Sequence, residues 1–255
     1  MNTYKIIIQY KGTAYSGFQI QSDERTIQGE INQALKILSH SENVKSIGSG
    51  RTDAGVHAFA QVLKIEIPVN IPIKGLPKAM NSHLPADIRV IHAELCDSTF
   101  HPIYSAKSKE YNYVFSLEDQ ISPFASEFMT YFSSDLNIEL MKNGCQLFCG
   151  EHDFINFQCT GTEIESTMRK IISCDIVQCN SSGHWQHVSE NYFVLKVVGT
   201  GFLKQMVRLM MGALVSLGKG KISLDDLQKS LQMPLKNRLG PTAPPQGLYL
   251  KEVHY

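Results

Sequence analysis

GSGRTDAGVHAFAQVLKIEI, residues 48–67, joins a glycine-rich loop to a run in which apolar and polar side chains alternate. The alternation has the period of a β-strand and predicts one from Ala60 to Ile67. The loop before it concentrates charged and polar side chains, among them Arg51, Asp53 and His57. A candidate site therefore lies on a loop that a strand anchors.

The chain on either side of this stretch mixes strand and helix patterns. Before residue 100, strands are expected at 4–10, 44–47, 60–67 and 88–95, with a helix at 26–38. After it, strands are expected at 109–117, 171–179, 192–198 and 247–253, and helices at 136–148 and 202–217, with a short helix opened by Ser223 and Asp226. Neighbouring strands without strict strand–helix alternation predict an α+β fold with mainly antiparallel sheets.

Composition restricts the class of protein. The chain has 255 residues, of which 43% are hydrophobic, enough for a sizeable core. The apolar runs are all shorter than a membrane span, and the first residues lack the pattern of a signal peptide, so we expect a cytosolic protein. Because 24 basic and 24 acidic residues balance, a nucleic-acid partner would have to bind a local patch.

The six cysteines do not indicate a metal centre or a disulfide framework. Cys145 and Cys149 are separated by three residues, and Cys174 and Cys179 by four, whereas zinc knuckles commonly use two. A chain of this size does not depend on disulfides for its core. Free thiols are expected.

Four kinds of site fit a loop of this composition. A phosphate loop needs a third glycine or a lysine, and the carboxylate of Asp53 would repel phosphate. A metal site built on Asp53 and His57, with His152 and Asp153 as further candidates, lacks a recognisable ligand spacing. The others are a structural turn and a catalytic loop in which Arg51 keeps Asp53 ionised. Spacing alone leaves these two open.

Seven blocks resemble the TruA-type tRNA pseudouridine synthase family in order and distance. They are YSGFQIQ with TIQGE (15–30), GRTDAGVHA (50–58), NSHLPADIRV (81–90), FHPIYSAKSKEYNY (100–113), GEHDFINF (150–157), GTGFLKQMVRLMMG (199–212) and APPQGLYL (243–250). These blocks extend over nearly the whole chain, which leaves little room for chance agreement.

The resemblance implies a fold and an activity. The expected fold is two ferredoxin-like (RRM-like) halves, residues 1–104 and 105–255, whose sheets join into one extended sheet with the active-site cleft between them. The expected activity is isomerisation of uridine to pseudouridine in the anticodon arm of tRNA, at tRNA positions 38 to 40. The family works as a homodimer, without a cofactor or metal ion.

The resemblance also implies residue roles. Asp53 matches the family's nucleophile, Arg51 and Arg208 match arginines that contact it, and Tyr111 matches the tyrosine that stacks on the target base. Further candidates for contact with the RNA are Tyr113, Lys107 and Lys204. From residue types alone, Tyr111 is better explained as a core aromatic, whereas ordinary surface charge explains Arg208 almost as well and the lysines equally well.

Departures from the family pattern keep a second interpretation open. Phe18 stands where the family usually has tryptophan, and Pro102 and Ile103 replace an alanine and an arginine, which removes a positive charge. The alternative is a noncatalytic tRNA-binding or folding factor in which Asp53 is structural. A nucleoside hydrolase is a third possibility, and release of free uracil would reveal it.

Overall fold

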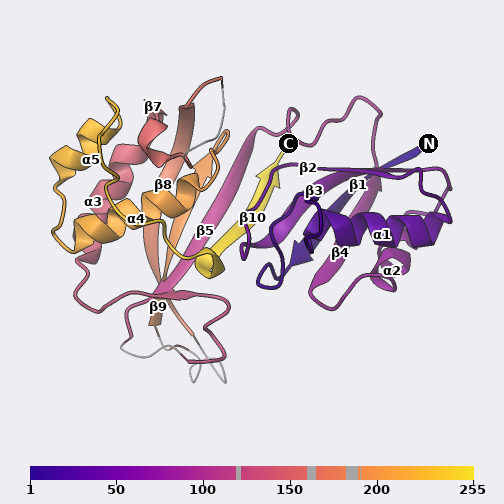
Figure 1. The fold of residues 1–255 in the computed structure, drawn as a ribbon, viewed down its shortest axis with the longest axis horizontal. Coiled ribbons are helices and arrows are strands. Elements are labelled where there is room, and N and C mark those ends of the chain that lie inside the picture. Colours follow the sequence, from indigo (N-terminus) through magenta and orange to yellow (C-terminus); the bar gives the residue numbers. More distant parts are fainter. Residues whose placement is uncertain (119–121, 160–164, 182–188, 190) are drawn as a thin grey trace. The chain divides into compact units, whose positions relative to one another are not determined.

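A computed structural model describes residues 1–118, 122–159, 165–181, 189 and 191–255 (Figure 1). The chain divides into two compact units. Unit 1 contains Met1–Lys107 together with Tyr249–Tyr255, and unit 2 contains Ser108–Leu248. The units differ from the expected division at 104 and 105 mainly in residues 249–255, which group with unit 1.

Unit 1 has the ferredoxin-like order of elements. They are β1 (Asn2–Tyr10), α1 (Ile27–Ser39), β2 (Lys45–Gly48), β3 (His57–Ile67), α2 (Leu76–Asn81) and β4 (Ile88–Leu95). Its strands lie in the order β4-β1-β3, with β2 also pairing with β3, and all these pairings are antiparallel. A parallel strand, β10 (Leu248–His254), is added where Tyr249 and Leu250 pair with His57 and Ala58.

The core of unit 1 follows from two periodicities. On β1, the alternate residues Tyr4, Ile6 and Ile8 have no exposed surface. On α1, the buried positions Ile27, Ile31, Ala34 and Leu35 recur at helical spacing. The helix begins after Thr26, whose side chain accepts a hydrogen bond from the Gly29 N–H. The sequence predicted this helix and its buried stripe.

Unit 2 is a second mixed unit. Its strands are β5 (Ser108–Ser116), β6 (Thr130–Tyr131), β7 (Gly150–Asp153), β8 (Met168–Asn180) and β9 (Asn191–Gly199). Its helices are α3 (Ile138–Phe148), α4 (Met206–Gly218) and α5 (Leu224–Ser230), with short 3₁₀ turns η1 (Ile155–Phe157) and η3 (Pro245–Gly247). The order β5-β9-β8-β7 is antiparallel throughout, and β6 joins β5 in parallel.

The helix α4 forms the centre of the unit 2 core. Every residue from Leu209 to Gly218 is buried, and α3 packs against both α4 and β8. The helix begins at Met206 and not at Phe202, because Gln205 has a left-handed backbone with φ 63°. The expected α+β class with mainly antiparallel strands is confirmed in both units.

Candidate active site

The loop between β2 and β3 carries Arg51 and Asp53 and is fixed to its own unit at both ends. The Ser49 N–H donates to the Val62 carbonyl at 2.8 Å, and the Val56 N–H donates to the Asp53 carbonyl at 3.2 Å. Arg51 is exposed, while Asp53 is only partly exposed. The loop therefore turns tightly at Asp53 and presents both side chains from a fixed backbone.

The segment that follows β1 holds the loop from the other side. The Phe18 N–H donates to the Thr52 carbonyl at 3.0 Å, and the Gly55 N–H donates to the Tyr15 carbonyl at 3.3 Å. The Tyr10 and Thr52 hydroxyls lie 2.8 Å apart in a buried hydrogen bond. These contacts join the block around YSGFQIQ to the block around GRTDAGVHA.

Glycines allow the two segments to approach this closely. A Cβ on Gly12 would lie 1.9 Å from the Val56 carbonyl oxygen, a distance that no side chain tolerates. Gly17 has φ +102°, and a Cβ there would lie 2.9 Å from the Thr52 carbonyl oxygen. Gly12 and Gly17 are thus required where the segment after β1 meets the backbone of the loop.

His57 is a packing residue of this arrangement. It is 2% exposed, its Nδ1 accepts a hydrogen bond from the Gly12 N–H at 3.0 Å, and its ring stacks on Tyr249 with centroids 4.8 Å apart. Because Nδ1 accepts from the main chain, a neutral ring with its proton on Nε2 fits this site. The structure therefore gives His57 a structural role beside Asp53.

In unit 2, the strand β5 places Lys109, Tyr111 and Tyr113 on one face. Tyr111 is 8% exposed, and its ring meets Phe202 edge to face with centroids 4.9 Å apart. Burial lowers the pKa of Lys109 from its ordinary value. Tyr111 and Phe202 thus form an aromatic corner between β5 and the segment that leads into α4.

Tyr113 has no exposed surface. Its hydroxyl lies 2.8 Å from the Thr130 hydroxyl and donates to the Pro244 carbonyl at 2.8 Å. Burial raises the pKa of Tyr113, and the Thr130 hydrogen bond and the Arg208 charge act in the opposite direction. The alternation that puts Tyr113 beside Tyr111 also puts it in the core, and its contact with the RNA stays a prediction.

Arg208 lies in the first turns of α4 and is tied to the segment after α5. Its Nε–H donates to the Ala243 carbonyl at 2.7 Å, and the Ala243 N–H donates back to the Arg208 carbonyl at 3.1 Å. The side chain of Arg208 is only partly exposed. An ordinary surface charge on a solvated helix face would be more exposed. Because the carbonyl contact engages Nε, it fixes the direction in which the planar guanidinium points.

The two candidate lysines are exposed. Lys107 follows the FHPIYS segment, and its N–H donates to the His254 carbonyl at 2.8 Å. Lys204 stands just before α4, and its carbonyl accepts from the Cys159 N–H at 3.2 Å. Both ammonium groups can meet a phosphate, as can any exposed lysine.

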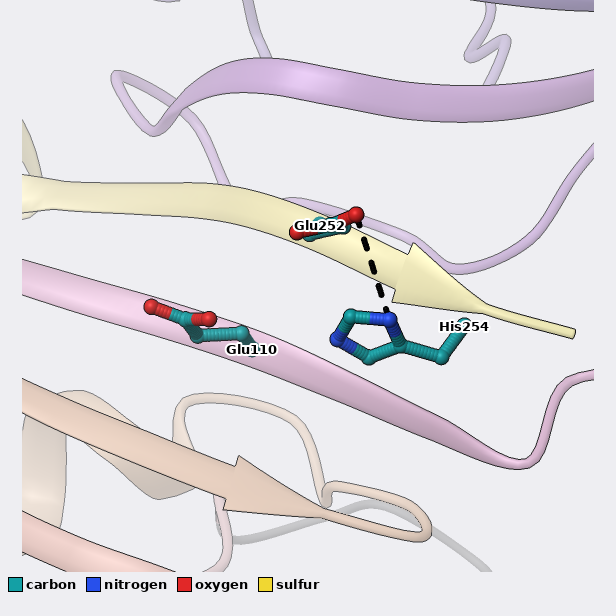
Figure 2. A group of neighbouring side chains, drawn as sticks. All are labelled: Glu110, Glu252 and His254. Atoms are coloured by element: carbon teal, nitrogen blue, oxygen red, sulfur yellow. Dashed lines mark ion pairs between the residues drawn. The ribbon is translucent and has the colours of Figure 1, made fainter.

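Cysteines and acidic residues are the remaining chemically reactive groups. All six cysteines are free thiols, with Cys145 and Cys174 buried, which confirms the expected thiol state. On β10, the side chains of Glu252 and His254 form an ion pair at 3.9 Å, and 53% and 44% of their surfaces are exposed (Figure 2). Glu110, also drawn there, belongs to β5 of unit 2. The exposed pair alone offers two ligands, fewer than stable metal sites use.

Sequence reasoning found the loop and α4 but missed the groups that hold them. Tyr10, Thr52 and Gln61 underlie the loop, and Ala243 and Pro244 hold Arg208 and Tyr113. The sequence alone does not single out Gln61, because the same strand also carries the polar residues Lys64 and Glu66. In the part of the chain that the structure describes, no helix combines the length and apolarity of a membrane span.

Known proteins resemble this chain over its whole length. A family model described as tRNA pseudouridine synthase matches residues 6–105 and 145–255. The tRNA pseudouridine synthase A of Bacillus pumilus is 38% identical over 98% of this chain and 98% of its own length. That of Bacillus subtilis is 36% identical over the same shares, and that of a Geobacter species is 38% identical over 100% of this chain and 99% of its own.

Solved structures give a much weaker likeness. A chain in a structure described as a Cbf5-Nop10-Gar1 complex aligns with a TM-score of 0.32 and 15% identity, over 83% of this chain and 54% of that chain. A likeness of this size does not bear on the fold or the function. The family model and the full-length relatives suffice, and they show that the chain belongs to the TruA-type tRNA pseudouridine synthases, which are isomerases.

Proposed function

We propose that this chain converts uridine to pseudouridine in the anticodon arm of tRNA, with Asp53 as nucleophile and without a cofactor. The observation that carries the proposal is the placement of Asp53 in the family's signature block, on a loop whose backbone is held from two sides. A fixed backbone suits a nucleophile, because misplacing a reacting group by about 1 Å costs as much as 100-fold in rate.

A carboxylate fits the chemistry of the reaction. Breaking the bond between N1 of uracil and C1′ of the ribose leaves positive charge on the sugar, which an ionised carboxylate can trap or stabilise. The uracil then rotates, C5 bonds to C1′, the proton on C5 is lost and N1 gains a proton. The atoms balance without an oxidant, a reductant or water, so no cofactor is needed.

The other candidates supply charge and a surface for the base. Arg51 and Arg208 are the proposed charge partners of the Asp53 carboxylate, and the contact with Ala243 fixes the direction of the Arg208 guanidinium. Tyr111 stacks on the uracil, which is worth about 1–3 kcal/mol. Lys107 and Lys204 contact phosphates of the RNA. Tyr113 acts from the core by holding the segment that holds Arg208.

The assembly and the compartment are part of the proposal. We expect the enzyme to act in the cytoplasm as a homodimer, as the family resemblance implies. The target base is stacked inside the anticodon arm and must be extruded before it can react.

The test is tritium release from unmodified tRNA labelled with [5-³H]uridine, because tritium leaves C5 only when the new bond forms there. Wild type should release tritium, and Asp53→Asn should release it at least about 1,000-fold more slowly while it still binds tRNA. Asp225→Asn, the same change at an exposed site on α5, is the control and should match wild type. Mapping of the modified positions then tests the anticodon arm.

The alternative is a noncatalytic tRNA-binding factor in which Asp53 is only structural, since a turn that is held by backbone hydrogen bonds on both sides also fits that role. It predicts tRNA binding without tritium release by the wild type. Equal release by wild type and Asp53→Asn would instead show an isomerase that uses another nucleophile.

A further inference from the structure

We propose that a buried hydrogen-bonded network of Ser49, Gln61, Tyr10 and Thr52 positions Asp53 for reaction. We call these four residues the loop anchor. The inference rests on the proposed role of Asp53 as nucleophile and adds residues that act through it without touching the RNA.

The first half of the loop anchor joins the end of β1 to the residue before Asp53. Tyr10 is 4% exposed and Thr52 is 7% exposed, and their hydroxyl oxygens are 2.8 Å apart. The Thr52 carbonyl also accepts the Phe18 N–H at 3.0 Å, so both the side chain and the backbone of Thr52 are held. Asp53 is the next residue, so the fixed backbone of Thr52 limits the directions in which the Asp53 side chain can point.

The second half reaches the loop from β3. Gln61 has no exposed surface, its Nε2 donates to the Gly50 carbonyl at 2.9 Å, and its Oε1 accepts from the Ser49 hydroxyl at 2.6 Å. The two halves act on the same short stretch of loop, because Gln61 holds Ser49 and Gly50 while Tyr10 holds Thr52. Burial raises the pKa of Tyr10, which keeps its hydroxyl protonated and able to donate.

The contacts alternate with the candidate catalytic residues along the loop. Gly50 and Thr52 are held from the interior, whereas Arg51 is exposed and Asp53 is partly exposed. Holding alternate residues directs the ones between them outward. The loop contains Gly50 and Gly55 and would otherwise sample many backbone conformations, so the loop anchor supplies the preorganisation that a nucleophile requires.

A buried tyrosine on the same strand provides the matched control. Tyr4 has no exposed surface, and its hydroxyl accepts from the Ile71 N–H at 2.9 Å and donates to the Ile71 carbonyl at 3.2 Å. Tyr4→Phe and Tyr10→Phe both remove one buried hydroxyl from β1. Only Tyr10→Phe removes a contact to the loop. If the Tyr10 hydroxyl only stabilised the fold, the two variants would have the same rate constant.

The experiment measures tritium release in a single turnover at saturating enzyme, the tRNA dissociation constant and the thermal midpoint for each variant. Tyr10→Phe and Thr52→Val should lower the rate constant about 10- to 100-fold without weakening tRNA binding. Thr52→Ser keeps the hydroxyl and should restore most of the rate. The double variant Tyr10→Phe/Thr52→Val should be no slower than the slower of its two single variants, because both changes break the hydrogen bond between the two hydroxyls.

Each outcome decides the matter. Equal rate constants for Tyr10→Phe and Tyr4→Phe, or a wild-type rate for Thr52→Val, overturn the positioning role while Asp53→Asn remains inactive. Full activity of Asp53→Asn overturns the proposed nucleophile itself and this inference with it. If Tyr10→Phe does not fold, the rate constants of Thr52→Val and Thr52→Ser decide, because equal values for these two variants overturn the positioning role.

Discussion

The loop that carries Asp53 and the helix that carries Arg208 are held in different ways. The loop has no regular structure of its own, and it depends on four buried polar side chains and on backbone contacts at Gly12 and Gly17. Arg208 is part of a thirteen-residue helix whose next ten residues are all buried. The loop can therefore be displaced by one small change, whereas the helix distributes any strain over a large core.

The largest effects are expected where backbone meets backbone in each region. Gly12→Ala would put a Cβ 1.9 Å from the Val56 carbonyl oxygen, and Gly212→Ala would put one 1.8 Å from the Pro241 carbonyl oxygen. Both should abolish tritium release. Gly212→Ala should cost more unfolding free energy, about 3 kcal/mol or more against about 1–2 for Gly12→Ala, because the loop can yield and the core cannot.

Urea unfolding and tritium release measure this pair, and Gly75→Ala is the control because its nearest contact would be an ordinary 3.4 Å. Equal destabilisation by Gly12→Ala and Gly212→Ala would contradict the idea that the loop yields separately from the core.

A smaller effect is expected from Arg208→Lys. The ammonium keeps the charge but lacks the Nε–H that binds the Ala243 carbonyl at 2.7 Å, so the charge loses its orientation. We expect the single-turnover rate to fall about 10-fold or more. The unfolding free energy should fall by only about 1 kcal/mol, since the main-chain bond from Ala243 remains. Wild-type activity in Arg208→Lys would mean that the carbonyl contact has no positioning role.

The smallest effect lies outside both regions, at the start of α5. Ser223 and Asp226 form a capping box, as the sequence predicted. Ser223→Ala should lower the unfolding free energy by about 1 kcal/mol and leave tritium release unchanged. A loss of tritium release in Ser223→Ala would contradict this, because it would show that the start of α5 affects the Asp53 loop or Arg208.

Much of the fold could be predicted because most elements have a clear period. The strand β4 was expected at its observed bounds, and α1 was expected within one residue at each end. The helix α2 was not predicted, because prolines at 72 and 77 indicate a broken chain while Pro77 in fact occupies the first turn of the helix, where its missing N–H costs nothing. Likewise, nothing local indicates the left-handed backbone of Gln205 that delays α4.

The site was predictable only as far as it is local in sequence. Arg51 and Asp53 share one block, and the resemblance supplied their roles. The hydroxyl pair of Tyr10 and Thr52 joins residues 42 apart, and the contact of Tyr113 with Pro244 joins residues 131 apart. Such pairs follow from strand order and register, which the pattern of one strand does not contain. For the same reason, alternation places Tyr113 on the same face as Tyr111 but does not predict the buried hydrogen bonds of the Tyr113 hydroxyl to Thr130 and Pro244.

The parallel pairing of β10 with β3 has a consequence for synthesis of the chain. Tyr249 and Leu250 pair with His57 and Ala58. A ribosome therefore translates all of unit 2 before the residues that close this edge of unit 1 exist. In the meantime the main-chain groups of His57 and Ala58 on that side, a few residues from Asp53, stay open to water or to a chaperone. A nascent chain stalled before Tyr249 would thus expose the flank of the loop that carries Asp53.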